Sequence, residues 1–312
     1  MEKMRGHARK INKRRLSDKP VIKKELKWLD FEDILTKVVT PLRQECNYRT
    51  FDGTLRSDTA IASSFQAFLT WGLLTFCAPR RQQEFQNLKI ATSCPIQKPL
   101  GLKSNQIIHP LPSNRLDKIE RYHGYLFKDF DGSWYTDMTS ESYKTGKTYG
   151  HQKLLIPNEL FGDGKTFYDY LEAFLYGYYR DCEGNWVSGG ASSNTFVGKS
   201  KYIGLRTAFN PKHNHIFSLK SGGVVSEAAF GEKFAQSAHR LTGKMTTPHL
   251  LRSIFATHFL DQGYSQDLIN SLAYGMGHSP DELRKEYDRR RPQQKHRPIE
   301  ETIAGLIQQF VA

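Results

Sequence analysis

Two short motifs and one tyrosine in the last third of the chain carry side chains that could act on a phosphate ester. The segment TTPHLLRS places His249 and Arg252 three residues apart, so both lie on one face if the segment is helical. The tripeptide GHS contains His278, 26 residues after Arg252, and Tyr287 follows nine residues later. A phenol can serve as nucleophile, a guanidinium as phosphate ligand, and imidazoles as groups that move protons.

Breaking a phosphodiester without a metal needs a nucleophile, cations on the non-bridging oxygens and an acid for the leaving oxygen. Arginine suits the second task because its planar fork binds two phosphate oxygens and stays charged. The segment PRRQQEF places Arg81 one turn before Glu84, a carboxylate that could orient it, and Arg80 competes for the same role. Each of these residues taken singly is more often structural, as a packed tyrosine, a capping histidine or a surface ion pair. Only the joint pattern indicates a site.

This joint pattern resembles the tyrosine recombinases, or phage-type integrases. The matching segments are PRRQQEFQNL, the HxxR of TTPHLLRSIFATHFLDQG, GMGHS and EYDR, in this order, and the resemblance covers about residues 58–292. HxxR alone is weak, whereas HxxR followed by GHS and tyrosine at these distances is specific. The segment HLLRS departs mildly from the HDLRH often seen in the family.

The resemblance implies a role for each matched residue. Tyr287 attacks phosphorus and forms a 3′-phosphotyrosyl link, while Arg81 and Arg252 hold the scissile phosphate. His249 helps to move the proton of the tyrosine, and His278 donates a hydrogen bond to the phosphate. The implied enzyme is a site-specific DNA recombinase or integrase of a mobile genetic element. It cuts and rejoins strands without metal, ATP or another cofactor.

The family also uses a lysine on a β-hairpin to protonate the leaving 5′ oxygen. The segment SYKTGKTYGHQKLLIP matches that hairpin, and Lys144 is the lysine the resemblance favours, with Lys147 as the near alternative. His213 and His215 form an HxH pair, but no cysteine or carboxylate lies at metal-ligand spacing, so they are interpreted as loop histidines.

Composition favours a polyanionic partner. The 312 residues carry a formal net charge of +13, with a pI of about 9.5. Residues 1–25 have ten Lys or Arg against three acids, and residues 284–297 have seven against two. Because basic side chains on phosphates release condensed counterions, double-stranded DNA is the expected partner. The four scattered cysteines, the lack of an apolar signal core and the lack of a membrane-spanning run favour an intracellular, DNA-associated protein without a membrane partner.

The element pattern predicts an α+β, mostly helical fold with a small antiparallel sheet, typical of a recombinase catalytic domain. Helices are expected over about 31–46, 59–78, from Pro79, 166–180 and 225–241, and a sheet over 121–157. Thr247, Ser265 and Ser279 are expected to cap three later helices, the last with a capping box to Glu282. A Gly/Ser-rich loop is expected over 183–204.

Three parts of the chain are distinguished. Residues 1–30 form a basic arm, 31–297 a catalytic domain and 298–312 an amphipathic helix. The 168 residues between Arg81 and His249 exceed the family's usual distance, which predicts an insertion within 158–222. Fewer than 60 residues precede the helix around Ile61, too few for the usual core-binding domain. Either the chain is a fragment, or the arm and the first helix replace that domain.

The amphipathic terminal helix is expected to take part in assembly. The stripe of Ile299, Ile303, Leu306 and Phe310 would be exposed on a monomer, so the helix is expected to dock on a neighbouring subunit in a homo-oligomer, a tetramer on paired sites. Packing on its own domain is the alternative.

Two other functions are compatible with the same residues. A type IB topoisomerase-like enzyme would use the same chemistry to relax DNA, and a non-catalytic protein would place helix 247–262 in the major groove.

Overall fold

The computed structural model describes residues 26–90, 124–128, 132–176, 178–180, 186–188 and 204–311. Residues 1–25 of the expected arm and most of the Gly/Ser-rich segment lie outside the described residues, as do the side chains of Leu306 and Phe310. The predictions made for these residues therefore stay predictions.

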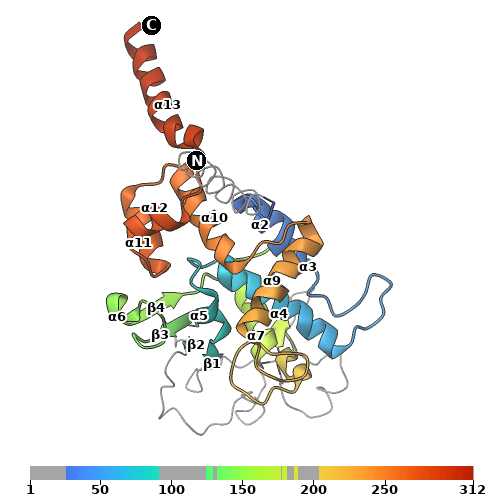
Figure 1. Cartoon of the computed structure of the whole chain (residues 1–312). Coiled ribbons are helices and arrows are strands. Elements are labelled where there is room, and N and C mark those ends of the chain that lie inside the picture. Colours follow the sequence, from blue (N-terminus) through green and yellow to red (C-terminus); the bar gives the residue numbers. More distant parts are fainter. Residues whose placement is uncertain are drawn as a thin grey trace, which may run out of the picture.

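The described chain is mostly helical, with a small four-stranded sheet and a separate pair of strands, which confirms the mixed α and β class (Figure 1). The first helical segment is continuous through a π-turn and comprises α2 (Phe31–Ile34), η1 (Leu35–Val39) and α3 (Thr40–Gln44). The other helices are α4 (Asp58–Thr75), α5 (Gln82–Gln86), α6 (Gly146–Tyr149), α7 (Phe167–Tyr176), η3 (Leu205–Phe209), α9 (Glu227–Thr242), α10 (Pro248–Asp261), α11 (Gln266–Gly275), α12 (Pro280–Tyr287) and α13 (Pro292–Val311).

Hydroxyl side chains begin the three helices that carry the motifs, as predicted. Thr247 accepts a hydrogen bond from Leu250 N at 3.3 Å and begins α10. Ser265 begins α11 in the same way, and Ser279 accepts from Glu282 N at 3.1 Å to begin α12. These bonds satisfy amide groups that have no partner within the helix, so the sequence fixes where each helix starts.

The sheet has the order β1-β2-β3-β4, with β1 (Lys89–Ile90), β2 (Tyr125–Lys128), β3 (Trp134–Met138) and β4 (Gln152–Leu155). The antiparallel pairs β2–β3 and β3–β4 confirm the predicted sheet. The parallel pairing of β1 with β2 was not predicted, because two residues are too few to show a strand pattern. The loop between β3 and β4 contains α6 and both candidate lysines.

Helix α4 lies at the centre of the core. Trp71 stacks on Phe234 of α9 with ring centroids 3.7 Å apart, and Phe68 meets Phe167 of α7 edge-on at 5.8 Å. Phe167 and Phe174 are fully buried. Helix α7 lies inside the range predicted as an insertion, yet it is part of the central core.

Sheet and core are joined by a buried carboxylate. Glu172 of α7 forms an ion pair with Lys128 of β2 and accepts a hydrogen bond from Trp134 Nε1 at 3.1 Å. Because both charged groups are buried, each depends on the other for compensation. These contacts fix the β2–β3 hairpin against α7 at one end of β3, and the β3–β4 loop follows the other end.

The helix predicted from Pro79 is present as α5, but its predicted start is wrong. Arg81 has extended backbone angles, φ −64° and ψ 143°, and the helix begins one residue later at Gln82. The carbonyl of Pro79 instead accepts a hydrogen bond from Arg252 Nη1 at 2.8 Å. This long-range contact favours the extended start, and proline's tolerance of a first helical turn could not reveal it.

Two other predicted boundaries are corrected. The helix predicted over 166–180 ends at Tyr176, and β5 (Tyr178–Arg180) pairs with β6 (Trp186–Ser188), so part of the predicted loop is a strand. The terminal helix starts at Pro292, not at residue 298, and Pro298 lies inside it. Pro292 and Pro298 are each compatible with the first turn of a helix, and the helix begins at the earlier one, Pro292. Figure 1 shows α13 extending away from the other helices.

Candidate functional site

The candidate nucleophile lies against an arginine and a histidine that are far from it in sequence. Arg252 Nε donates to the Tyr287 hydroxyl at 3.3 Å, and that hydroxyl lies 3.1 Å from His278 Nε2. Arg252 Nη2 also contacts His278 Nε2. Three of the six residues singled out from the sequence therefore form one hydrogen-bonded cluster, which α10, α12 and the turn between α11 and α12 build together.

Main-chain carbonyls hold the guanidinium of Arg252 in this cluster. Its Nη1 donates to Pro79 O at 2.8 Å and its Nη2 to Met276 O at 3.0 Å. The side chain is buried, and burial lowers the pKa of Arg252, while the neighbouring Tyr287 raises it. Arg252 therefore joins the segment before α5 to the turn after α11.

The GHS turn owes its shape to Gly277. This glycine has φ +70°, and its amide donates to Tyr274 O while His278 N donates to Ala273 O, which is a Schellman ending of α11. A side chain at position 277 would be strained by φ and would place its Cβ 3.1 Å from Thr145 Oγ1. The turn presents His278 and the carbonyls of residues 276 and 277 to the site.

His278 is buried with its second ring nitrogen next to a carboxylate. Its Nδ1 lies 2.9 Å from Glu282 Oε1, although the N–H direction and the carboxylate are not aligned as in an ideal hydrogen bond. Burial, together with the charge of Arg252, lowers the pKa of His278 to about 4. The imidazole is therefore neutral at pH 7. Glu282 was expected to complete a capping box with Ser279, but its carboxylate contacts His278.

Arg81 reaches the site through a threonine. Its Nη1 donates to Thr145 Oγ1 at 3.2 Å, and that hydroxyl donates to Gly277 O at 3.0 Å. Glu84 Oε1 lies 3.7 Å from the same Nη1. About a quarter of the Arg81 side chain is exposed (23%), so this guanidinium remains open to an incoming anion.

Arg80 has a different environment from its neighbour. It is fully buried, pairs with Glu84, contacts Gln152 Oε1 and donates to Gly275 O at 3.2 Å. These bonds tie the start of α5 to β4 and to the end of α11. The two neighbouring arginines therefore differ, because the side chain of Arg81 is partly exposed whereas that of Arg80 is fully buried in structural contacts.

His249 and the two lysines lie at the rim. The ring of His249 is exposed, and its centroid is 5.9 Å from that of Tyr287. Lys144 and Lys147 are also exposed, on either side of Thr145 and Gly146. The turn predicted at Thr145-Gly146 is the start of α6, where a Cβ on Gly146 would lie 2.0 Å from Ser140 O. The structure gives neither lysine a direct contact with Tyr287 within the described residues.

Tyr287 is the last residue of α12, and hydrogen bonds to the main chain at this point hold it in place. Thr257 Oγ1 of α10 donates to Tyr287 O at 3.2 Å and accepts from Arg289 N at 2.9 Å. Only 6% of Tyr287 is exposed, compared with 1% of Arg252 and 2% of His278. Around this buried cluster, the candidate residues Arg81 and His249 have more exposed side chains.

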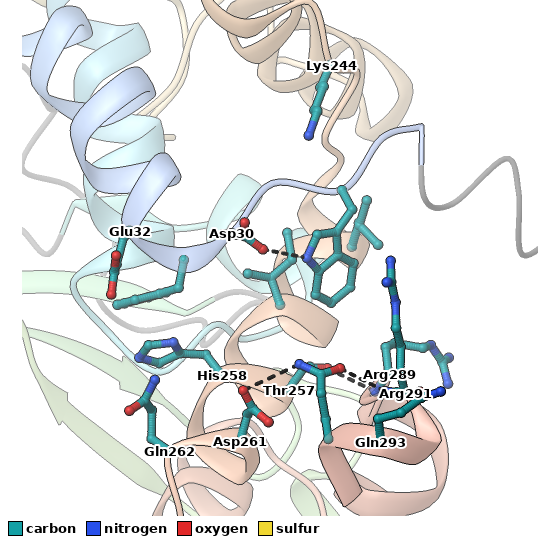
Figure 2. A pocket seen from close by; sticks show the side chains of 15 residues that line it. Asp30, Glu32, Lys244, Thr257, His258, Asp261, Gln262, Arg289, Arg291 and Gln293 are labelled. Atoms are coloured by element: carbon teal, nitrogen blue, oxygen red, sulfur yellow. Dashed lines mark hydrogen bonds between the residues drawn. The ribbon is translucent and has the colours of Figure 1, made fainter. Parts of the chain in front are cut away.

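A cavity of about 1230 Å³ lies elsewhere (Figure 2). Its lining includes Leu250, Ile254 and His258, which form a stripe on α10 away from Arg252. Figure 2 shows Arg289 and Arg291 together on one side of it. None of the six candidate residues lines this cavity.

The described residues contain no group of three or more His, Cys, Asp or Glu side chains arranged to hold a metal. His213 and His215 instead surround Arg206, which donates to their carbonyl oxygens at 2.8 and 2.5 Å. Among the helices of the described ranges, none combines the length and apolar character that crossing a bilayer requires.

Three residues of the site were not singled out from the sequence for these roles: Thr145, Gly277 and Glu282. Gly277 carried a signal, since a glycine directly after a helix is typical of a left-handed cap. The role of Thr145 depends on the fold of the β3–β4 loop against α11. Comparison with models of protein families, with curated proteins and with solved structures found no match.

Proposed function

We propose that this protein is a DNA strand transferase of the tyrosine type, which cuts and rejoins duplex DNA through a 3′-phosphotyrosyl intermediate. The observation that carries the proposal is the contact of the Tyr287 hydroxyl with Arg252 and His278, with Arg81 at the open side. A nucleophile next to a base and fixed cations is the arrangement that phosphoryl transfer requires.

The charges in the site suit an anionic substrate. Arg81 and Arg252 are close enough for the charge of Arg81 to lower the pKa of Arg252. Two neighbouring guanidinium groups repel each other until an anion enters, and a phosphate oxygen relieves that repulsion while accepting their hydrogen bonds. The net charge of +13 supports a duplex as the source of that phosphate.

In the reaction, the oxygen of Tyr287 attacks the scissile phosphorus and the 5′ oxygen leaves. Arg81 and Arg252 neutralise the charge that develops on the non-bridging oxygens, and Lys144, with Lys147 as its alternative, protonates the leaving oxygen. The phosphotyrosyl bond conserves the energy of the phosphodiester, so a second 5′ hydroxyl can reverse the step. Tyr287 contacts Arg252 and His278 of its own chain, which favours cleavage in cis.

The proposed function also implies the partners of this protein. Double-stranded DNA is the substrate, and the protein associates with that DNA inside the cell. Helix α13 leaves Ile299 and Ile303 exposed by 55% and 50%, and we propose that this stripe docks on a second copy when two sites are paired. Deletion of residues 298–312 should then reduce assembly on DNA, and unchanged assembly contradicts the docking.

A covalent trap tests the proposed function. Duplexes of random sequence are first selected for binding to the protein and then nicked just downstream of the cleaved position, so that the released 5′-hydroxyl fragment diffuses away. The wild-type protein is expected to accumulate a covalent adduct, and Tyr287→Phe is expected to bind the same duplex without forming it. An adduct of equal yield with Tyr287→Phe excludes this nucleophile. Relaxation of a supercoiled plasmid without paired sites would favour a topoisomerase over strand exchange.

A further inference from the structure

We propose that Glu282 is a positioning residue that keeps the Nδ1 proton on His278, so that Nε2 accepts the phenol proton of Tyr287 during attack. The inference rests on the proposed function and deepens it by assigning the base. It also departs from the resemblance, which gives the movement of that proton to His249.

The hydrogen-bond pattern determines the tautomer of His278. Arg252 Nη2 and the Tyr287 hydroxyl both face Nε2. A guanidinium can only donate, so Nε2 must carry the lone pair and the ring proton must lie on Nδ1. The carboxylate of Glu282, 2.9 Å from Nδ1, is the group that favours this tautomer.

Burial and the nearby arginines keep His278 neutral in the free protein. A bound phosphate then makes protonation of His278 favourable. The charged groups that face it are Arg252 and Arg81, which disfavour an imidazolium, and Glu282, which favours one. A bound phosphate brings negative charge to both arginines and offsets their repulsion of a second cation. Its oxygens also offer Arg252 stronger acceptors than an imidazole nitrogen, which leaves Nε2 to Tyr287.

The step is balanced in atoms and charge. The O–H bond of Tyr287 breaks and its proton moves to His278 Nε2, while the phenolate oxygen forms a bond to phosphorus. The bond from phosphorus to the 5′ oxygen breaks, and that oxygen takes a proton from the acid of the site. Glu282 stabilises the imidazolium, which returns its proton to Tyr287 when the strand is rejoined.

The geometry favours His278 over His249 for this role. The ring of His278 is the nearer one, with a centroid 5.0 Å from that of Tyr287 compared with 5.9 Å for His249. His278 is also buried, and its Nε2 lies 3.1 Å from the Tyr287 hydroxyl. A nucleophile, a base in contact with it and a third group that orients the base form a recurring catalytic arrangement. Tyr287, His278 and Glu282 have that relationship.

The first test measures the rate of adduct formation in a single turnover on the selected nicked duplex. Glu282→Ala is expected to slow it by about 10- to 100-fold, the order found when the group that orients a metal-binding histidine is removed. Glu282→Gln keeps an acceptor for Nδ1–H and should lose less. Asp281→Asn is the matched control, because it removes one carboxylate from the same helical turn, and it should stay within about twofold. A rate for Glu282→Ala within twofold of the wild-type rate overturns the proposal.

A second substrate separates the base from the acid. A duplex with sulfur in place of the leaving 5′ oxygen needs no proton on its leaving group. The defect of Glu282→Ala should persist on this substrate, while that of a Lys144→Ala variant should be relieved if that lysine is the acid. Full rescue of Glu282→Ala by sulfur would mean that Glu282 serves the acid, and would overturn the assignment.

Nitrogen NMR of the free protein tests the tautomer without DNA. The ring signals of His278, identified by their loss in His278→Asn, should show a protonated Nδ1 in the wild-type protein and a mixture of tautomers in Glu282→Ala. A protonated Nε2 in the wild-type protein contradicts the role of Glu282, whatever the enzyme acts on. If the tautomer is as proposed but no adduct forms, the proposed function fails instead.

Discussion

Arg252 Nε lies 3.3 Å from the Tyr287 hydroxyl, although 35 residues separate the two in the chain. The same guanidinium binds two carbonyl oxygens, so its position is set before any substrate arrives. Donors fixed beside the reacting atom need no reorganisation at the moment of reaction. The contact between these two residues is therefore both a structural link and the basis of the proposed chemistry.

Arg252→Lys should separate charge from geometry. A lysine keeps the positive charge but cannot supply the planar fork that reaches Pro79 O, Met276 O and Tyr287 together. We expect adduct formation to slow by about 10²- to 10³-fold, as for loss of one transition-state donor. Urea unfolding should show a loss of about 1–3 kcal/mol from the buried carbonyls left without donors. Arg284→Lys on the exposed face of α12 is the control, and equal activity of the two variants would contradict the account.

Alanine substitutions at Arg80 and Arg81 should affect different properties, the first stability and the second adduct formation. Arg81→Ala should abolish adduct formation with little change in the free energy of unfolding, because this side chain is partly exposed. Arg80→Ala leaves Glu84 as a buried charge and should destabilise the fold by about 3–5 kcal/mol. Thermal unfolding and the trap assay on both variants check this. A stable Arg80→Ala protein beside an unstable Arg81→Ala protein would reverse the two roles.

Thr145 is expected to position Arg81 through its hydroxyl. Thr145→Val keeps the shape but removes the link from Arg81 Nη1 to Gly277 O, and one hydrogen bond of about 1 kcal/mol corresponds to about a fivefold slower reaction. Thr145→Ser should restore the rate. If valine and serine give the same rate, the hydroxyl does not hold the arginine.

The stability of the protein should fall in acid partly because of His278. Its pKa is lowered to about 4 by burial and by Arg252, whereas an unfolded histidine titrates near its ordinary value of about 6.5. As pH falls between these values the unfolded chain binds the proton first, so up to about 3 kcal/mol of stability is lost.

Urea unfolding at pH 7, 5.5 and 4.5 measures this loss. The difference between wild type and His278→Asn isolates the contribution of His278 from other groups that titrate in acid. That difference should shrink as pH falls from 6.5 towards 4. A difference that does not change with pH would mean that His278 is not held neutral.

Local signals in the sequence predicted much of the fold. Thr247, Ser265 and Ser279 each begin a helix where predicted, because a hydroxyl followed by free amides is a local arrangement. Pro79 misled for the opposite reason, since its carbonyl binds Arg252, 173 residues away in the chain. Pro298 also follows a local rule, but the earlier Pro292 begins the helix.

The site was predicted by residue type but not by contact. The spacing of Arg252, His278 and Tyr287 indicated a cluster, and the structure brings these three together. It could not show that Thr145 would bridge to Arg81, because that depends on how the β3–β4 loop packs on the end of α11. Nor could it show that Glu282 would turn to His278, since the capping pattern offered that carboxylate a nearer partner.

The most direct measurement of the central claim is the identity of the residue that carries the DNA. The covalent adduct is digested with nuclease and trypsin, and mass spectrometry locates the nucleotide. Trypsin cuts after Lys285 and Arg289, so the account predicts a nucleotide joined through a 3′ phosphate to the peptide EYDR, residues 286–289. A nucleotide on any other peptide, or no adduct on any selected duplex, would contradict it.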